Sequence, residues 1–530
     1  MNSSVTRRGL LALAGVGVTA LLLAGCVTTT STNASSSSDG DPVPGGTLVY
    51  GTKSEPGNGG LDPFSTAVYS STAIQALIYD TLLTKDNDGT LRPLIAESWT
   101  TNDDKTEFVF TIRDGATFAD GSPITVDDVA FSFNKVREST LSKKSYLTDL
   151  KGLTTDAVAR TVTFTFNKSN PAFLNIVSDR KSFFIVSQNW YDTTSEQDRQ
   201  KTANASGAFS LDHWTQGVEV VLTKNSKYWD QPKPYLDGIT FKVVPDENTL
   251  LTQLQSGQID AGWFWNSTLA QQGKDSGLTL GELQSTSTRV LYLNSEGAFN
   301  DVRVRQAFSK AVDRDQLAKV GAQGFGEVSF VTEPTQIGVD APNDSTPNYQ
   351  RDVEGAKQLL AEAGQTNPTI SLVYQADSND KSTWELLKQQ AAEAGITVDL
   401  QPVEYSRIQA VFTSGAPFFG DIIAVQNVGR PDVAGDFNQW VPESANLNAF
   451  KGSTQTARLQ ELFGQLTSEA DDQKRLQVAN DLNQEIAEQS FIVVAYATPL
   501  SYSLSTSKVH GYSPDPFDSR TSLLTTWIGR

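Results

Sequence analysis

The chain has 530 residues, with 42 Lys and Arg against 61 Asp and Glu, and its formal net charge is -19. This acidic balance argues against nucleic acid and anionic lipid surfaces as partners, because both carry dense negative charge. Cys26 is the only cysteine, and the two histidines, His213 and His510, lie far apart in the sequence. An intrachain disulfide and a cysteine-based zinc site are therefore excluded, and we expect neither a multi-histidine metal site nor a cofactor.

The N-terminal stretch has the layout of a signal peptide. Arg7 and Arg8 precede seventeen uncharged residues, 9–25, which is short of the ~20 apolar residues that a spanning helix needs. The stretch ends in Leu-Ala-Gly before Cys26. It resembles the bacterial lipobox, in which cleavage occurs before the cysteine and the thiol receives diacylglycerol. The arginine pair also resembles a twin-arginine signal, so both Sec and twin-arginine export stay open.

Residues 26–45 are predicted to form a flexible, lipidated tether. They are rich in Ser and Thr and cannot bury enough apolar surface to fold. Two acyl chains and an acylated amine on Cys26 would give stable anchoring, whereas one chain binds a membrane only marginally. We therefore expect a protein held through Cys26 at the outer face of the cytoplasmic membrane, or in the periplasm.

The first half of the remaining chain reads as alternating strands and helices. Apolar residues at every second position predict strands over 47–51, 108–112, 162–166, 218–222 and 239–243. Helical spacing predicts helices over 72–83, 126–137 and 248–255. The helix at 126–137 has a clear start signal, because Thr125 can cap it and Asp128 follows three residues later.

Three consecutive aromatic residues, Trp263, Phe264 and Trp265, follow the second of these regions. Neighbouring side chains on a strand point to opposite faces, so the three cannot all enter one core. At least one is expected to line a surface or a cleft. The alternative is that they divide between a core and the underside of a loop.

The second half alternates more regularly. Strands are predicted over 289–294, 369–374, 397–402, 422–425 and 491–496, and helices over 301–320, 353–363, 382–394, 456–466 and 471–489. Gly364 and Gly395 come just after two of these helices, as is common at helix ends. The order strand, helix, strand in this half is typical of α/β architecture.

Six sequence blocks in this order match one family pattern. They are Leu94–Trp99, Phe108–Gly115, Ser206–Phe209, Asn225–Trp229, Ser256–Asp260 and Asp301–Phe308. The chain therefore resembles the extracellular solute-binding proteins of family 5, the oligopeptide-, dipeptide- and nickel-binding components of ABC importers. The resemblance covers nearly the whole chain after the tether.

This resemblance implies an α/β, two-lobed periplasmic-binding-protein-like fold of type II, similar to cluster C, with an extra subdomain in lobe one. Lobe one would comprise residues 46–68, 202–285 and 492–530. The subdomain would comprise 69–201, and lobe two 286–491. Strands near 289–294 and 491–496 would form the hinge, because two extended crossings can close by a few backbone rotations.

The resemblance further implies a monomeric receptor that traps a small solute, by default an oligopeptide, and delivers it to the permease of an ABC importer. Peptide-binding members carry a Trp and an Asp in a lobe-two loop, and the matching stretch here, 426–432, lacks the Trp. A sugar, an opine or a metal chelate is the alternative solute. Asp432 or Asp436 could replace the family's carboxylate, which pairs with the peptide α-amino group, or be a solvated loop residue.

The predicted ligand contacts combine aromatic walls with a few polar groups. The aromatic residues are Trp263, Phe264 and Trp265. Asn427 and Arg430 lie on the facing loop, where Arg430 could pair with a neighbouring aspartate or with an anionic ligand group. Tyr496 on a hinge strand is a further candidate.

Two other classes of function compete with the importer receptor. A secreted hydrolase is disfavoured, because the sequence has no Gly-x-Ser-x-Gly elbow, no His-Glu-x-x-His motif and no cysteine nucleophile after the tether. We therefore do not expect an enzyme. A lipoprotein that senses a solute without importing it stays open, because the same closed form could dock on a sensor.

Overall fold

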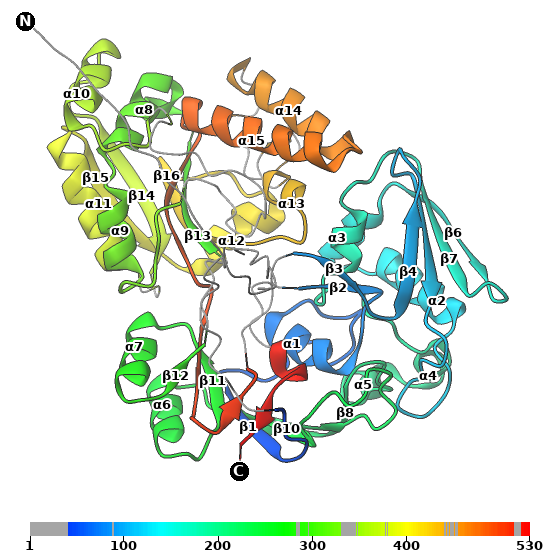
Figure 1. Ribbon diagram of the computed structural model, residues 1–530. Helices are drawn as coiled ribbons and strands as arrows, with labels where there is room; N and C mark the ends of the chain where they lie inside the picture. Colours follow the sequence, from blue (N-terminus) through cyan, green and yellow to red (C-terminus); the bar gives the residue numbers. More distant parts are fainter. Residues whose placement is uncertain are drawn as a thin grey trace, which may run out of the picture. The chain divides into compact units, whose positions relative to one another are not determined.

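Three β-sheets organise the part of the chain that the computed structural model describes (Figure 1). The described residues are 41–86, 89–281, 287–294, 296–329, 346, 348–376, 378, 380–438, 441–442, 445, 450, 454–512 and 521–529. Cys26, the expected signal peptide and almost all of the expected tether lie outside them. Residues 41–530 form one compact unit. Within the described ranges, no helix is both long and apolar enough to cross a membrane.

The seven-stranded sheet gathers strands from three separate stretches of sequence. Its order is β12-β18-β11-β1-β10-β9-β8. The strands are β1 (Thr47–Thr52), β8 (Phe209–Thr215), β9 (Glu219–Lys224), β10 (Gly238–Val243), β11 (Ala261–Phe264), β12 (Thr279–Leu280) and β18 (Tyr502–Ser505). Helices α6 (Glu247–Gln255) and α7 (Ser267–Asp275) pack on one face through Leu250, Leu254 and Leu269. The strands predicted at 47–51, 218–222 and 239–243 are confirmed.

The four-stranded sheet is antiparallel, in the order β4-β5-β7-β6. It consists of β4 (Ala96–Thr101), β5 (Glu107–Ile112), β6 (Leu150–Asp156) and β7 (Thr161–Phe166). Phe108 pairs with Phe164 across β5 and β7, and the alternation predicted for each strand is confirmed by the buried positions of both. The neighbouring helix α2 (Val126–Glu138) begins with the predicted cap, because Thr125 and Asp128 exchange side-chain to backbone hydrogen bonds.

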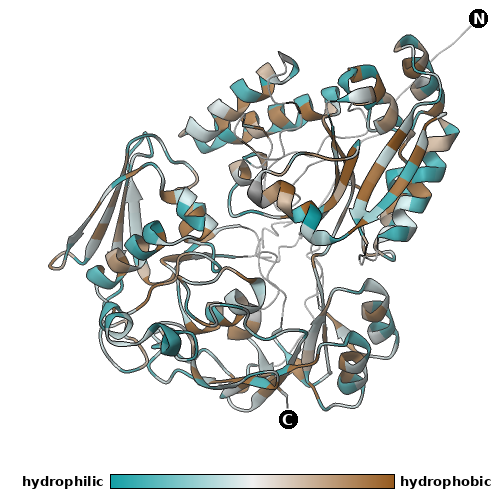
Figure 2. Ribbon diagram, turned by 180° about the vertical axis from the view of Figure 1, so that it is seen from behind, coloured by the Kyte–Doolittle hydropathy of each residue, from teal (hydrophilic) through white to brown (hydrophobic). Residues whose placement is uncertain are grey.

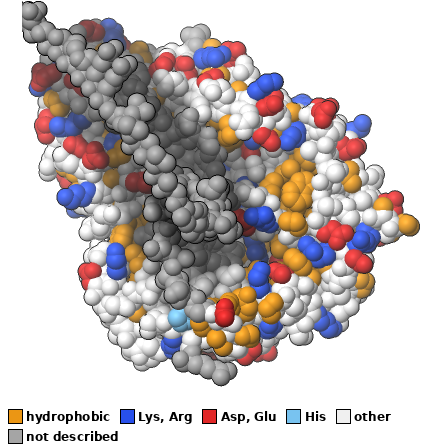
Figure 3. All heavy atoms as spheres, in the orientation of Figure 1, with side chains coloured by type: hydrophobic (Ala, Val, Ile, Leu, Met, Phe, Trp, Pro, Cys, Tyr) orange, Lys and Arg blue, Asp and Glu red, His pale blue; other side chains and the backbone are white. Residues whose placement is uncertain are grey.

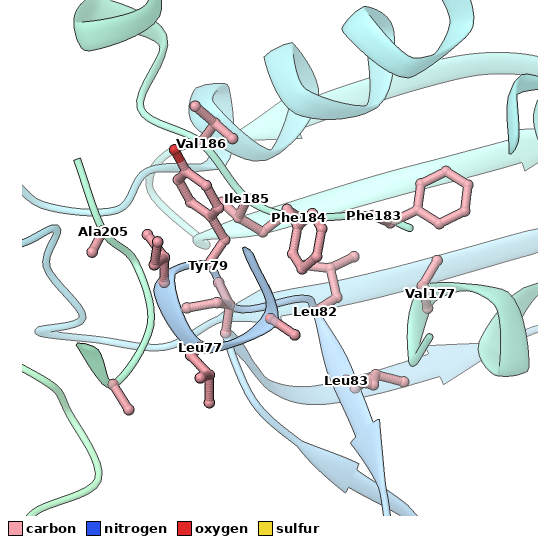
Figure 4. Packing of buried hydrophobic residues seen from close by; sticks show 14 of the residues in the cluster. Leu77, Tyr79, Leu82, Leu83, Val177, Phe183, Phe184, Ile185, Val186 and Ala205 are labelled. Carbon is pink, nitrogen blue, oxygen red and sulfur yellow. The ribbon is translucent and has the colours of Figure 1, made fainter. Parts of the chain in front are cut away.

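Shorter elements surround this sheet. They are α1 (Tyr69–Ile78), β2 (Leu83–Lys85), β3 (Leu91–Pro93), η1 (Ser142–Leu147), α3 (Phe173–Val177), α4 (Gln188–Thr193) and α5 (Glu196–Arg199). The helix predicted over 72–83 is wrong at its end, because α1 stops at Ile78. After it, the backbone of Ile78 and Asp80 bonds to Gly207 and Ile185, which lie far away in the sequence. Figure 4 shows Tyr79 and Ile185 in the apolar cluster formed there.

The five-stranded sheet has the order β15-β14-β16-β13-β17. Its strands are β13 (Ser287–Leu293), β14 (Thr369–Gln375), β15 (Thr397–Val403), β16 (Ile422–Val428) and β17 (Ile492–Thr498). Strands β14, β15 and β16 are parallel, as the strand and helix order predicts. On β13, Leu291 and Leu293 face one apolar cluster while Val290 and Tyr292 face another. This sheet is therefore the middle of three layers.

Helices cover both faces of this sheet, with their hydrophilic residues outward in Figure 2. One side carries α8 (Val302–Ala311), α9 (Arg314–Gly321), α10 (Val353–Glu362) and α11 (Lys381–Glu393). The other carries α12 (Tyr405–Ser414), α13 (Val433–Phe437), α14 (Ala457–Ser468) and α15 (Asp472–Gln489). The single helix predicted over 301–320 is wrong. It is two helices, because Val312 is extended and Asp313 caps α9 by accepting a hydrogen bond from the backbone of Gln316.

The chain passes between the two larger sheets at two neighbouring places. It leaves β12 for β13 through residues 281–286 and returns from β17 to β18 through residues 499–501. β13 and β17 are antiparallel neighbours, and Ser287 lies opposite Thr498 at their ends. The remaining short elements are η2 (Gly297–Asn300), η3 (Thr454–Thr456), β19 (Val509–His510), η4 (Thr521–Leu524) and β20 (Trp527–Ile528).

Candidate ligand-binding site

An aromatic wall lies at the end of β11, made by Tyr69, Trp263 and Trp265. The ring centroids of Trp263 and Trp265 are 4.7 Å apart at 81°, and those of Trp263 and Tyr69 are 5.8 Å apart at 90°. Such edge-to-face pairs are favourable beyond the area that they bury. Trp263 is buried, whereas Trp265 is 39% exposed. Trp265 is therefore the member of the wall that can contact a solute.

The carboxylate of Glu247 fixes the turn that carries Trp265. It accepts hydrogen bonds from the backbone N–H groups of Trp265 and Asn266, both at 3.1 Å. Lys53 Nζ lies 3.3 Å from the same carboxylate. Asn266 in turn caps α7 through its side chain. The exposed indole thus stands on a rigid backbone, which lowers the entropy lost when a ligand binds.

Phe264 points to the opposite face of the sheet. It is fully buried with Leu250, Ile259 and Leu504 in the cluster under α6 and α7. The division of the three aromatic residues between faces follows from strand alternation. In this structure Phe264 supports β11 from behind, while Trp263 and Trp265 form the wall.

Polar groups meet where β16, β13 and β17 end together. Asn427 is buried on β16 and lies opposite Thr288 of β13. Beside them, Gln426 Nε2 donates to Ser287 Oγ at 2.8 Å, and this hydroxyl donates to the carbonyl of Thr498 at 3.0 Å. Asn427 therefore sits next to the two connections between the larger sheets, where a hinge residue is expected.

Tyr496 lies fully buried on β17 beside the Arg289–Asp380 pair. Arg289 Nε donates to Asp380 Oδ1 at 2.9 Å. Burial alone would lower the pKa of Arg289, but Asp380 outweighs it and raises that pKa above its ordinary value. Burial raises the pKa of Tyr496 to about 12. Both side chains thus keep their ordinary protonation state, a guanidinium next to a neutral phenol.

Asp432 is engaged with protein groups. Its carboxylate pairs with both terminal nitrogens of Arg475, and it accepts from Asn175 Nδ2 and from the backbone of Ala434, each at 2.9 Å. Burial alone would raise its pKa, but Arg475 and these hydrogen bonds hold the pKa below its ordinary value. A ligand amine at Asp432 would have to compete with Arg475. The side chain of Asp436 lies outside the described residues.

Arg430 lies in the loop after β16 and lines a small pocket with a volume of about 30 Å³. Lys85 lines the same pocket, and its Nζ donates to the carbonyl of Pro431 at 3.0 Å. The sequence reasoning missed Lys85, Tyr69 and Glu247, because only the fold brings them to residues so distant in sequence. Among the described residues, no three His, Cys, Asp or Glu side chains group closely enough to hold a metal ion.

The fold is that of a solute-binding protein. The model of bacterial extracellular solute-binding proteins, family 5, matches residues 90–441. The chain belongs to this family, whose members are solute-binding receptors of ABC importers, outside the cytoplasm, and not enzymes.

Known relatives extend the match. The oligopeptide-binding protein AppA of Bacillus subtilis is 27% identical over 76% of this chain and 77% of its own. Heme-binding protein A of Haemophilus influenzae is 26% identical over 94% of this chain and 95% of its own. Among solved structures, the substrate-binding protein CtaP of Listeria monocytogenes aligns with a TM-score of 0.80 and 23% identity over 92% of this chain and 100% of that one.

Proposed function

We propose that this chain is a lipid-anchored receptor that captures an oligopeptide between two lobes and hands it to the permease of an ABC importer. Family membership supports the receptor role. The likeness to oligopeptide-binding AppA over 76% of the chain supports the peptide. The structural observation that carries the proposal is the aromatic wall with exposed Trp265. Its neighbour Phe264 pairs with Tyr502 of β18, whose hydroxyl lies 3.3 Å from Thr498 Oγ1 at the end of β17.

In this proposal the receptor works as a monomeric trap. Lobe one comprises residues 46–68, 202–285 and 492–530, with the added subdomain at 69–201, and lobe two comprises 286–491. Small backbone rotations at the two neighbouring connections open and close the lobes. A solute that contacts both lobes binds the closed form better and shifts the population toward it. Cys26, lipidated, keeps the trap beside its transporter.

The proposed contacts come from both lobes. Trp265 supplies apolar surface from lobe one, with the buried Trp263 packed behind it, and Asn427 and Arg430 supply hydrogen-bond donors from lobe two. Asp432 is the weakest of the predicted contacts, because Arg475 already pairs with its carboxylate. The α-amino group of a peptide would then be bound without Asp432, or would displace part of this pair.

A non-peptide solute of the same importer class is the second candidate. The observation that favours it is the likeness over 94% of the chain to a heme-binding protein, together with the missing Trp in the loop at 426–432. A sugar, an opine or a metal chelate falls into the same class. Each would fit an aromatic wall with few charged contacts.

Thermal unfolding of the purified protein against solute panels tests this proposal. A ligand at 100 times its Kd stabilises the folded state by about 2.7 kcal/mol, which raises the melting temperature by a measurable amount. We expect at least one member of a panel of short peptides, which includes a nonapeptide because AppA of Bacillus subtilis was solved with one, to raise it. If heme, a sugar or a chelate raises the melting temperature and no peptide does, the solute is not a peptide but a member of that other class. Hydrolysis of the added peptides would contradict the receptor role.

A further inference from the structure

The pocket beside Arg430 has a cation-rich lining. It lies between β2 with the turn after α3 on one side and the loop after β16 on the other. Its described lining carries Lys85, Arg180, Lys181 and Arg430, with Asp179 as the acidic member. The chain as a whole has a net charge of -19. Figure 3 shows acidic and basic side chains interspersed over the drawn face. The charged residues that line the pocket are therefore mostly basic, although the chain as a whole is acidic.

The carboxylate of Asp179, the acidic residue of the lining, bonds within its own turn. Asp179 Oδ1 accepts from the backbone N–H of Lys181 at 3.3 Å, and Oδ2 accepts from Ser182 Oγ at 2.5 Å. These two hydrogen bonds stabilise the turn that carries Arg180 and Lys181.

Arg180 lines the pocket and is held in place by contacts with the protein. Its Nη2 donates to the carbonyl of Ala76 at 2.6 Å and lies 3.6 Å from Asp80 Oδ1. Its Nε is closed to solvent, so an anion in the pocket would meet the outer part of the guanidinium. An oxyanion carries several lone pairs and matches the fork of a guanidinium.

The backbone around the pocket is held by the apolar core. Val177 and Phe183 are buried on either side of the turn at 178–182, and Leu83 is buried just before Lys85. Figure 4 shows these three side chains among the packed buried hydrophobic residues. Lys85 also spans the pocket to the carbonyl of Pro431. Cationic groups fixed in this way bind an anion with little reorganisation.

We propose that this pocket binds an oxyanion group, a carboxylate or phosphate, contributed either by the captured solute or by a free anion. The two walls belong to different sheets, so a bound anion holds the turn after α3 against the loop after β16. The site then selects for anionic solutes, or couples closure to an anion. The case in which the captured solute carries the anionic group rests on the function proposed above, whereas binding of a free anion does not.

A charge-removing pair of substitutions tests this site. The variant Lys181→Gln with Arg430→Gln removes two cations that line the pocket. The matched control, Arg137→Gln with Lys274→Gln, removes the same charge from exposed positions on α2 and α7. In one arm inorganic phosphate is titrated at constant ionic strength by calorimetry. In the other, a peptide found in the thermal panel is compared with its C-terminal amide.

The expected result is a loss confined to the pocket variant. If the anion is free, phosphate affinity falls roughly tenfold or more while the control binds as wild type does. If the solute brings it, the preference for the free carboxylate over the amide falls by a similar factor. Equal behaviour of the two double variants in both arms would overturn the site. Failure of every solute to bind would overturn the receptor role instead, and the phosphate arm would still decide the site.

Discussion

Asn175 donates a hydrogen bond of 2.9 Å to Asp432, and this bond joins α3, beside the four-stranded sheet, to the loop after β16 in the five-stranded sheet. The same carboxylate pairs with Arg475 of α15. Asp432 and Arg475 are both buried. The position of α3 is therefore coupled to the helix layer behind the five-stranded sheet through one carboxylate.

Asn175→Ala should weaken solute binding with little change in thermal stability. A single hydrogen bond to a charged group contributes about 1.5–3 kcal/mol, so its loss should raise the Kd of a bound solute by roughly tenfold or more if it helps to hold the closed form. Calorimetry measures the Kd. Asn189→Ala, at an exposed position of α4, is the control. An unchanged Kd in Asn175→Ala would mean that the contact persists in the open form.

Asp432→Ala should be strongly destabilising, because it leaves the Arg475 guanidinium buried without its carboxylate. We expect a loss of about 3–5 kcal/mol in unfolding free energy, measured by chemical denaturation. Glu461→Ala removes a comparable but exposed pair with Arg458 and should cost no more than about 1 kcal/mol. Equal losses in the two variants would contradict the assignment.

The same variant has a predicted pH dependence. Burial opposes the ionisation of Asp432, but Arg475 and the hydrogen bonds outweigh it and lower the pKa in the folded protein. The ionised carboxylate therefore contributes its full stability above the ordinary aspartate pKa and loses it as pH falls through the lowered folded pKa. The difference between wild type and Asp432→Ala should shrink in that acidic range.

Asp80→Asn should stabilise the protein at pH 8. Burial raises the pKa of Asp80 to about 6, although Arg180 opposes this rise. Above pH 6 the ionised side chain then costs about 3 kcal/mol relative to the unfolded chain. As pH falls from 6 toward the unfolded pKa, the folded protein takes up the proton first and the cost disappears. The gain from Asn should therefore be large at pH 8 and small at pH 4.5.

Denaturation of wild type and Asp80→Asn at the two pH values measures this difference. The exposed Asp275 of α7 supplies the control, and its change to Asn should stay within about 0.5 kcal/mol at both. A variant less stable than wild type at pH 8 would mean that the pairing of ionised Asp80 with Arg180 outweighs the burial of its charge.

Trp265→Ala should weaken solute binding without unfolding the protein. The indole is 39% exposed on a fixed turn, so its removal should raise the Kd by roughly tenfold while the melting temperature changes little. Phe264→Ala should do the reverse and cost about 3–5 kcal/mol of stability, because it empties a buried site. Tyr405→Ala, 51% exposed on α12, is the control for loss of a surface aromatic.

Cys26→Ala tests the proposed anchor. Without the thiol, no diacylglycerol can be attached, so the protein should appear in the medium or stay unprocessed at its full size. Fractionation of cells followed by measurement of the mass gives the result. A product of mature size that remains with the membrane would show that something other than a lipid on Cys26 holds the chain there.

The sequence predicted most elements whose signals are local. Thr125 and Asp128 predicted the start of α2, because all residues of a capping box lie within four consecutive positions. The break between α8 and α9 was missed, since Val312 fits the apolar stripe of one long helix and the cap at Asp313 lies inside that stripe. The end of α1 was missed because its backbone partners near 185 and 207 are distant in sequence.

The candidate site was predicted less well for the same reason. Trp263 and Trp265 stood out because adjacent aromatic residues on a strand must diverge. From the sequence, Asp432 was either a ligand carboxylate or a solvated loop residue, because its partners Arg475 and Asn175 lie 43 and 257 residues away. The turn after α3 carried no motif, and only its placement against the loop after β16 makes its cations part of a pocket.

The chain links the seven-stranded and five-stranded sheets twice, through residues 281–286 and 499–501, so either link alone would keep the sheets covalently joined. β17 is held by the hydrogen bonds of β13 in the five-stranded sheet, and β18 by those of β11 and β12 in the seven-stranded sheet. A cut between Pro499 and Ser501 would therefore leave each strand in its own sheet and one covalent crossing intact. The joint thus offers a place where new chain ends can be made, as in a circular permutant, with both sheets still complete.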